Sequence, residues 1–255
     1  MNLKVALFII LMTPGLVYSG VIADKTRVII NEGKPYNTLK LYNNAQFPSI
    51  IQMFISESSD KDETTFVGVS DIHMSPPIFK VEGGESQEVK IRYLGMPLPK
   101  QTEKVYYLHI IQTPPLTGHA GKNQLVITQR HIIKIFVRSD DLQYSSSLDF
   151  DNVRFILSRT GKGHMLTFYN QSFFHLNILN VNSDIQPFVN VSSLCEDSFG
   201  DIGIENMMVS PGEHYNFHID KYLDVDKLSS QCRMIVKVVA EHGGVVTKLV
   251  NIEVE

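Results

Sequence analysis

Residues 124–138 read QLVITQRHIIKIFVR, and this stretch decides the fold class. Its first part alternates with a period of two, which puts Leu125, Ile127 and Gln129 on one face of a β-strand. A strand over the whole stretch is far longer than the usual strand of about five or six residues. The pattern therefore predicts a β-protein with one unusually long strand.

Shorter runs of β-branched and aromatic residues recur along the chain between Gly, Pro, Asn, Asp and Ser clusters, and helical periodicity is almost absent. The whole chain is therefore predicted to be all-β, as in sandwiches or barrels. In the first half we expect strands at Thr26–Ile30, Thr38–Asn43, Ser49–Ser56, Ile78–Val81, Gln87–Tyr93, Val105–Gln112 and Gln124–Val137. In the second half we expect strands at Met165–Asn170, His175–Val181, Phe188–Val191, His214–Ile219, Met234–Ala240 and Val245–Val254.

Two polar clusters divide the chain into two halves of similar size. Ser139-Asp140-Asp141 and Ser145-Ser146-Ser147 follow the long strand, and we interpret them as a domain boundary. The seven strands expected before them match one immunoglobulin-like sandwich. We therefore expect a first domain over residues 20–140 and a second over residues 141–255.

The first nineteen residues have the layout of a secretory signal peptide. Lys4 gives a basic start, the stretch from Val5 to Tyr18 is mostly apolar, and cleavage is expected after Ser19. The apolar stretch is too short to span a bilayer comfortably, and no later run is apolar enough to do so. The sequence thus predicts an exported, soluble protein once residues 1–19 are removed.

The composition excludes several classes of protein. Apolar residues make up 43% and charged residues 20% of the 255 residues, so the chain is not a disordered polyelectrolyte. A formal net charge of −4 gives no general attraction to nucleic acid or to anionic membranes. We therefore expect neither of them as a partner.

Sequence motifs for catalysis or metal binding are absent. The chain contains no H-E-x-x-H, G-x-S-x-G or Walker-type loop. His214 and His218 are four residues apart in a strand-like run, where two side chains are too distant to share one ion without help. We expect no metal, no cofactor and no enzyme activity; labelling by a broad hydrolase probe would revive the hydrolase alternative.

The two cysteines, Cys195 and Cys232, both lie in the second half. In an exported chain a single pair is most simply one disulfide, which would contribute about 3–4 kcal/mol in the chain-entropy account. The alternative is a reactive thiol pair, but neither a C-x-x-C spacing nor a nearby basic cluster supports it.

Two cations of the first half interrupt apolar strands. Arg27 lies at the start of its strand, and Lys134 lies among isoleucine, phenylalanine and valine residues. An unpaired buried charge is expensive, so the residues alone favour long side chains that reach water at a sheet edge. The long apolar strand has a second interpretation, because an open edge can be used for strand addition to a partner. Leu125 and Ile127 would each contribute about 1.5–3 kcal/mol if buried in that partner.

Several segments, in order along the chain, resemble one known family, the periplasmic chaperones of the chaperone–usher pilus pathway. In the first half they are Asp24-Lys25-Thr26-Arg27, the stretch from Ser75-Pro76-Pro77 to Gln87, Val105-Tyr106-Tyr107-Leu108 with Thr113-Pro114-Pro115, and Ile133-Lys134-Ile135-Phe136-Val137-Arg138. In the second half they are Leu166-Thr167-Phe168-Tyr169-Asn170, Met208-Val209-Ser210-Pro211-Gly212 and Glu241-His242-Gly243-Gly244.

This resemblance implies two immunoglobulin-like β-sandwich domains in an L-shaped (boomerang) arrangement. It implies that Arg27 and Lys134 anchor the terminal carboxylate of a pilus subunit, and that Leu125, Ile127 and Gln129 form the strand donated to that subunit. The implied partners are pilus subunits and an outer-membrane usher, in the periplasm. The resemblance leaves open whether the free chaperone self-associates.

The chain departs from the family at two positions. Gln129 stands where many relatives have a third apolar residue, and Ser139 stands where relatives often have proline. The stretch from Pro114 to Asn123 is short, which resembles the short-loop branch of the family. The alternative function is a structural or adhesive pilus component, but Gly20–Lys25 is too short for the N-terminal extension that such a subunit carries.

Overall fold

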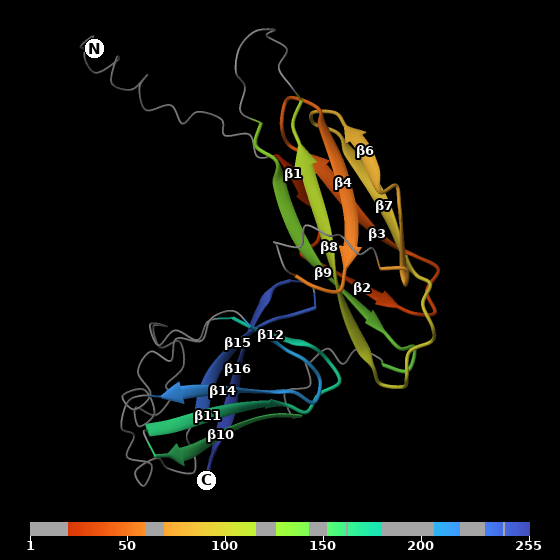
Figure 1. Cartoon of the computed structure of the whole chain (residues 1–255). Helices are drawn as coiled ribbons and strands as arrows, with labels where there is room; N and C mark the ends of the chain where they lie inside the picture. The colour runs from red at the N-terminus through yellow and green to blue at the C-terminus, as the bar shows by residue number, and fades with distance from the viewer. Residues whose placement is uncertain are drawn as a thin grey trace, which may run out of the picture.

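The computed structural model describes residues 20–59, 69–115, 126–142, 152–161, 163–179, 207–219, 233–241 and 243–255. These residues form sixteen strands and no α-helix, in two separate β-bodies set at an angle to each other (Figure 1). The all-β prediction with two sandwich domains is confirmed. No helix in the described ranges is long and apolar enough to cross a membrane.

The first domain is a sandwich of two sheets. One sheet has four strands in the order β1 (Val21–Ala23), β3 (Asn37–Asn43), β7 (Ser86–Tyr93) and β5 (Ile72–Ser75). The other has five strands in the order β2 (Arg27–Asn31), β9 (Gln129–Arg138), β8 (Glu103–Thr113), β4 (Ser49–Ser56) and β6 (Ile78–Val81). The largest side chains buried between them include Ile30, Leu39, Leu41, Ile51, Ile91, Leu108 and Ile135.

The start of the domain is divided between the two sheets, and this leaves an edge open. β1 pairs with β3 in the four-stranded sheet, whereas β2 pairs in parallel with β9 in the other. β2 covers β9 only from Lys134 to Arg138. On that side the stretch from Gln129 to Ile133 has no strand partner among the described residues, so its backbone groups face outward.

The two faces of β9 contact different parts of the molecule, because successive side chains of a strand point to opposite faces. Ile133, Ile135 and Val137 enter the core of the first domain. Lys134 and Arg138 lie on the opposite face, which is directed toward the second domain. Lys134 contacts Asn177 and Arg138 contacts Glu241, both in the second domain, so the two cations lie between the domains.

The second domain is built around β16 (Val245–Val254). β16 pairs antiparallel with β15 (Arg233–Val239) over its first part and in parallel with β10 (Val153–Thr160) near its end. The remaining strands are β11 (Gly163–Asn170), β12 (Leu176–Ile178), β13 (Met207–Val209) and β14 (His214–Ile219). The strand order is β13-β12-β15-β16-β10-β11-β14.

The same buried corner recurs in both domains. Asn43 Nδ2 donates to carbonyl oxygens 4 and 38 residues further along the chain, and Asn170 Nδ2 donates to carbonyl oxygens 4 and 39 residues further along. Gly84 and Gly212 donate their N–H groups to the carbonyls of these two asparagines, both at 2.8 Å, and both glycines have positive φ (78° and 75°). Each domain therefore contains the same asparagine–glycine corner, which is stabilised within that domain by an equivalent set of hydrogen bonds.

The structure corrects part of the strand prediction. It adds β1, β5, β10 and β13, which the sequence analysis did not predict, and it shortens the strand expected at His175–Val181 to β12. Three of the missed strands have three or four residues, too few to give a clear alternation. The run expected at Phe188–Val191 lies outside the described residues.

The long strand expected from Gln124 begins at Gln129 in the structure. Val126, Ile127 and Thr128 are described but belong to no strand, and Ile127 is 66% exposed. The reason is physical, since alternation alone does not make a strand where no neighbour pairs with the backbone.

Candidate functional site

The structure brings the two predicted cations, Arg27 and Lys134, side by side. They are direct register partners on the parallel strands β2 and β9. Both side chains are half-buried and lie where the first domain faces the second. The residue pattern singled out each cation separately, and the resemblance implied that both bind one carboxylate; the register of β2 on β9 shows that they lie side by side.

Arg27 has few partners for its guanidinium group. Nη1 donates to the carbonyl oxygen of Val239 at 3.4 Å, and the guanidinium carbon lies 5.8 Å from the ring centroid of Phe136. Nε is buried and has no hydrogen-bond partner among the described residues. Burial, reinforced by the charge of Arg138, holds the pKa of Arg27 below its ordinary value, although Glu103 and Glu241 act in the other direction.

Lys134 is held by the second domain through a neutral group. Its Nζ donates to Oδ1 of Asn177 on β12. Burial and, second, the charge of Arg27 hold the pKa of Lys134 below its ordinary value. Neither Lys134 nor Arg27 forms an ion pair with a carboxylate in the described part of the chain. Two positive charges thus lie together, and no carboxylate of the described residues lies within ion-pair distance of either, although Glu103 and Glu241 act on Arg27 from further away.

A second group of charges lies nearby and is fully paired. Arg138 Nε binds Glu103 Oε2 at 2.6 Å, and Arg138 Nη1 binds Glu241 of the second domain. The other oxygen of Glu103 accepts from the backbone N and from Nδ1 of His175, at 2.7 and 2.9 Å. Burial alone would raise the pKa of Glu103, but the His175 hydrogen bonds and the Arg138 charge outweigh it and lower that pKa.

The sequence alone did not predict that these four residues interact. Arg138 and Glu241 appear there only within segments that resemble the family, and Glu103 and His175 were not singled out. The one feature of the sequence that indicated the network was Arg138, a charged residue at the end of an apolar strand. The network joins the two domains, since Glu103 and Arg138 belong to the first and His175 and Glu241 to the second.

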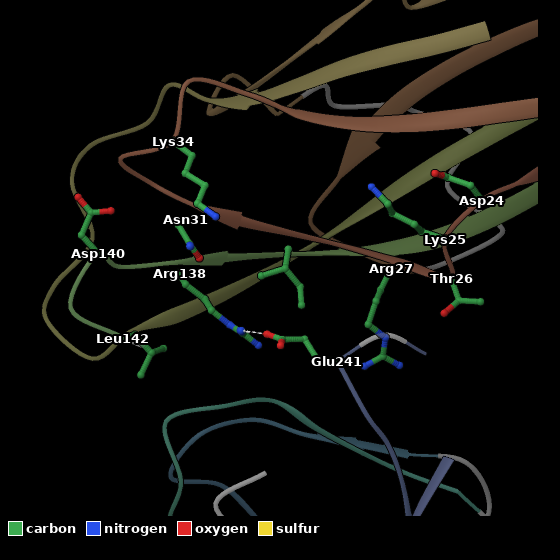
Figure 2. Close-up of a pocket in the computed structure, with 11 residues that line it drawn as sticks. Asp24, Lys25, Thr26, Arg27, Asn31, Lys34, Arg138, Asp140, Leu142 and Glu241 are labelled. Carbon is green, nitrogen blue, oxygen red and sulfur yellow. Dashed lines mark hydrogen bonds and ion pairs between the residues drawn. The ribbon is translucent and has the colours of Figure 1, made fainter. Parts of the chain in front are cut away.

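A cleft of about 860 Å³ opens beside these charges. Figure 2 shows Arg27 directed from β2 toward the second domain, with Glu241 lying between it and Arg138. The cleft is lined by Asp24, Lys25, Thr26, Arg27, Ile29, Asn31, Lys34, Arg138, Asp140, Leu142 and Glu241. Lys134 does not line this cleft, because its ammonium group is turned to Asn177.

The predicted donor residues are only partly described. Ile127 is 66% exposed, Gln129 is exposed at the start of β9, and Leu125 lies outside the described residues. Next to the open edge, an apolar groove of about 290 Å³ lies between β1 and β9. Its lining includes Val21, Ile22, Ala23, Lys25, Thr26, Leu41, Ile110, His131, Ile132 and Ile133. Thr26 and Ile133 of this lining are the chain neighbours of Arg27 and Lys134, so the groove lies next to the cation pair.

The other predicted features have different outcomes. Residues 1–19, Cys195 and Cys232 lie outside the described residues. His214 and His218 are exposed on β14, and His214 stacks on Tyr169 with ring centroids 5.4 Å apart. The described ranges contain no group of three or more His, Cys, Asp or Glu residues arranged to hold a metal ion.

Comparison with known proteins shows what the chain is similar to. Residues 20–143 match the family described as pili and flagellar-assembly chaperone, PapD N-terminal domain. The chain is 33% identical over 122 residues to the chaperone protein FimB/FhaD of Bordetella pertussis, covering 46% of this chain and 50% of that protein. It is 23% identical over 197 residues to the probable fimbrial chaperone protein ElfD of Escherichia coli, covering 77% and 73%. The chain thus spans about half the length of the first relative and nearly three quarters of the second.

Solved structures share the fold. A chain of the Salmonella enterica SafA pilin–SafB chaperone complex superposes with a TM-score of 0.66 at 19% identity, covering 93% of this chain and 98% of that chain. The CupB2 chaperone of Pseudomonas aeruginosa gives 0.64 at 18% identity, covering 91% and 100%. The comparisons confirm the resemblance found in the sequence, to the chaperones of pilus assembly.

Proposed function

We propose that this protein is a periplasmic chaperone that binds pilus subunits by donating a strand and delivers them to an outer-membrane usher. The observation that carries the proposal is the pair formed by Arg27 and Lys134, two adjacent cations beside an open strand edge, neither of which is ion-paired to a carboxylate of the described residues. The names of the relatives, a chaperone protein and a probable fimbrial chaperone protein, support the same function.

The chemistry of the pair suits the terminal carboxylate of a polypeptide. Charge-assisted hydrogen bonds from a guanidinium and an ammonium group to one carboxylate are short and directional. A carboxylate fixed there would set the register of a subunit strand that runs along Gln129–Ile133. Ile127, and Leu125 before it, would then insert into the incomplete core of the subunit, with Gln129 as the last donor position.

The other features belong to the same proposal. The N-terminal domain covers residues 20–140 and the C-terminal domain residues 141–255, after removal of residues 1–19. Cys195 and Cys232 form one disulfide in the oxidising periplasm. The protein acts by binding, without an enzyme activity, a metal or a cofactor. A pilus component, the alternative function, requires an incomplete sandwich, whereas the first domain here has both of its sheets.

The test is capture of a pilus subunit after co-expression in the periplasm. We expect Arg27→Ala and Lys134→Ala each to abolish recovery of the complex while the variants themselves stay folded and soluble. Lys34→Ala is the matched control, because Lys34 is an exposed cation in the same cleft. Normal amounts of complex with either anchor variant would overturn the proposal.

A further inference from the structure

Two buried hydrogen-bond donors without acceptors lie at the boundary between the domains. Arg27 Nε comes from the first domain and Asn177 Nδ2 from the second, and neither has a partner among the described residues. A buried donor that is left unsatisfied costs free energy, and native structures rarely keep one without a reason. One donor belongs to the proposed anchor residue Arg27, and the other belongs to Asn177, whose Oδ1 accepts from the second anchor residue, Lys134.

Asn177 is held firmly in place. It is only 7% exposed and lies in the middle of β12, between the buried side chains of Leu176 and Ile178. β12 pairs with β13 on one side and with β15 on the other, so it is an interior strand of the second domain. An interior strand position fixes the amide group toward the cation pair, whereas a loop position would let it turn away.

We propose that Asn177 is the third contact of the carboxylate anchor and that it confers selectivity for a free terminal carboxylate. The inference rests on the proposed function, because it assigns a further residue to the same site. An ammonium group has three donors, and the one given to Asn177 Oδ1 leaves two for a ligand. A carboxylate has two oxygens with about four acceptor positions. In this proposal one bound carboxylate accepts from Lys134 Nζ, Arg27 Nε and Asn177 Nδ2 together, and its entry uncovers the two donors that are buried in the free chain.

This arrangement gives the second domain a direct part in recognition. Asn177 Oδ1 orients Lys134, while Nδ2 requires an acceptor at the same place. A terminal amide offers one acceptor oxygen and adds its own N–H groups, which oppose the donors of Arg27, Lys134 and Asn177. The three residues thus distinguish a chain terminus from an amidated one, and from a peptide bond within a chain.

The experiment measures this selectivity with two synthetic peptides of the same alternating Val/Thr sequence, one ending in a carboxylate and one in an amide. Dissociation constants are measured by fluorescence anisotropy for the full mature chain and for its variants. We expect the unchanged protein to bind the carboxylate peptide at least tenfold more tightly than the amide peptide. Asn177→Asp has the same shape but offers a charge that pairs with Lys134 and repels the ligand, so we expect it to lower this ratio about tenfold.

Asn177→Ala is the second variant and should lower the ratio about three- to tenfold, because the Nδ2 donor is lost. A residue with a merely structural role would change binding of both peptides equally and leave the ratio unmoved. Unchanged ratios in both variants, with a ratio that collapses in Arg27→Ala, would overturn the role of Asn177 and leave the proposed function intact. A ratio near one in the unchanged protein would overturn both.

Discussion

Two cationic sites lie four residues apart on the same face of β9, and they differ in every respect that matters. Arg138 is 8% exposed and paired with the carboxylates of Glu103 and Glu241. Among the described residues, Lys134 and Arg27 beside it donate hydrogen bonds to neutral oxygens, those of Asn177 and Val239. One site is complete within the chain, and the other has no paired carboxylate in the ranges that the structure describes.

Arg138 forms ion pairs that link the two domains, whereas Arg27 and Lys134 form a site that can bind the carboxylate of a partner. A buried ion pair with further hydrogen bonds stabilises the folded state mainly because breaking it leaves one charge uncompensated. Two adjacent positive charges repel each other and so lower the stability of the folded state. Such a pair is typical of a binding site in which a ligand supplies the negative charge. The predictions below test this contrast.

The largest effect is expected for Arg138→Ala. It leaves the buried carboxylate of Glu103 without its cation, so we expect the free energy of unfolding to fall by about 3–5 kcal/mol in denaturant titration. Arg27→Ala should change stability by less than about 1 kcal/mol, because it removes one weak hydrogen bond and one of two repelling charges. Equal losses in the two variants would contradict the contrast. Arg154→Ala, at the exposed pair with Glu253, is the control and should leave stability unchanged.

The pH dependence of stability on the acid side should report Glu103. Its pKa in the folded state lies below its ordinary value near 4.5, so its contribution to stability is complete above that value. The contribution is lost as the pH falls from about 4.5 through the lowered folded pKa. We expect unfolding free energies measured across this range to fall less steeply in Glu103→Gln than in the unchanged protein. The same slope in both proteins would remove Glu103 from the account.

The hairpin between β15 and β16 lies close to the first domain beside Arg27, and substitutions in it test this contact. Gly243 has φ of 83°, and a Cβ at this position would meet Thr26 Oγ1 of the first domain. Gly243→Ala should therefore destabilise the protein by about 1 kcal/mol or more, through strain and displacement of Thr26. Gly244→Ala is the matched control, since no atom lies within 4 Å of a Cβ there. Thermal unfolding of the two variants gives the comparison.

The smallest effect is expected on the alkaline side, from Lys134. Its folded pKa lies below the ordinary value near 10.5, so the unfolded chain binds more protons between the two values. Stability from this group therefore rises as the pH increases through that window. Lys134→Met should lack the rise and should be slightly more stable near neutral pH, because solvent screens the charge of this half-buried side chain and keeps the effect small. A variant that is less stable at neutral pH would contradict this.

The sequence predicts the fold class well because strands and turns are local. Most of the predicted strands of the first domain are present with ends that differ by one or two residues, and the turn at Gly83-Gly84 lies where expected. The short strands β1 and β5 escaped because three or four residues carry no clear period. The resemblance supplied Arg27 and Lys134 as a pair.

What the sequence cannot give is contact between residues that are distant along the chain. Asn177 lies 43 residues from Lys134, and Glu241 lies 103 residues from Arg138. Nothing in the local sequence of Asn177, between two apolar residues, distinguishes it from a polar residue on the outer face of a strand. The packing of the second domain against the first places Glu241 beside Arg138 and Asn177 beside Lys134, so it determines which cation is paired with a carboxylate.

The most direct test of the account is the pKa of Lys134 itself, followed by NMR with ¹³C-labelled lysine and assigned with Lys134→Met. In the free protein the account predicts a pKa below the ordinary value of 10.5. On binding a peptide with a free terminal carboxylate, the pKa should rise, whereas the amidated peptide should leave it lower. A Lys134 pKa at its ordinary value in the free protein, or one that both peptides leave unmoved, would contradict the claim that this cation pair awaits a carboxylate.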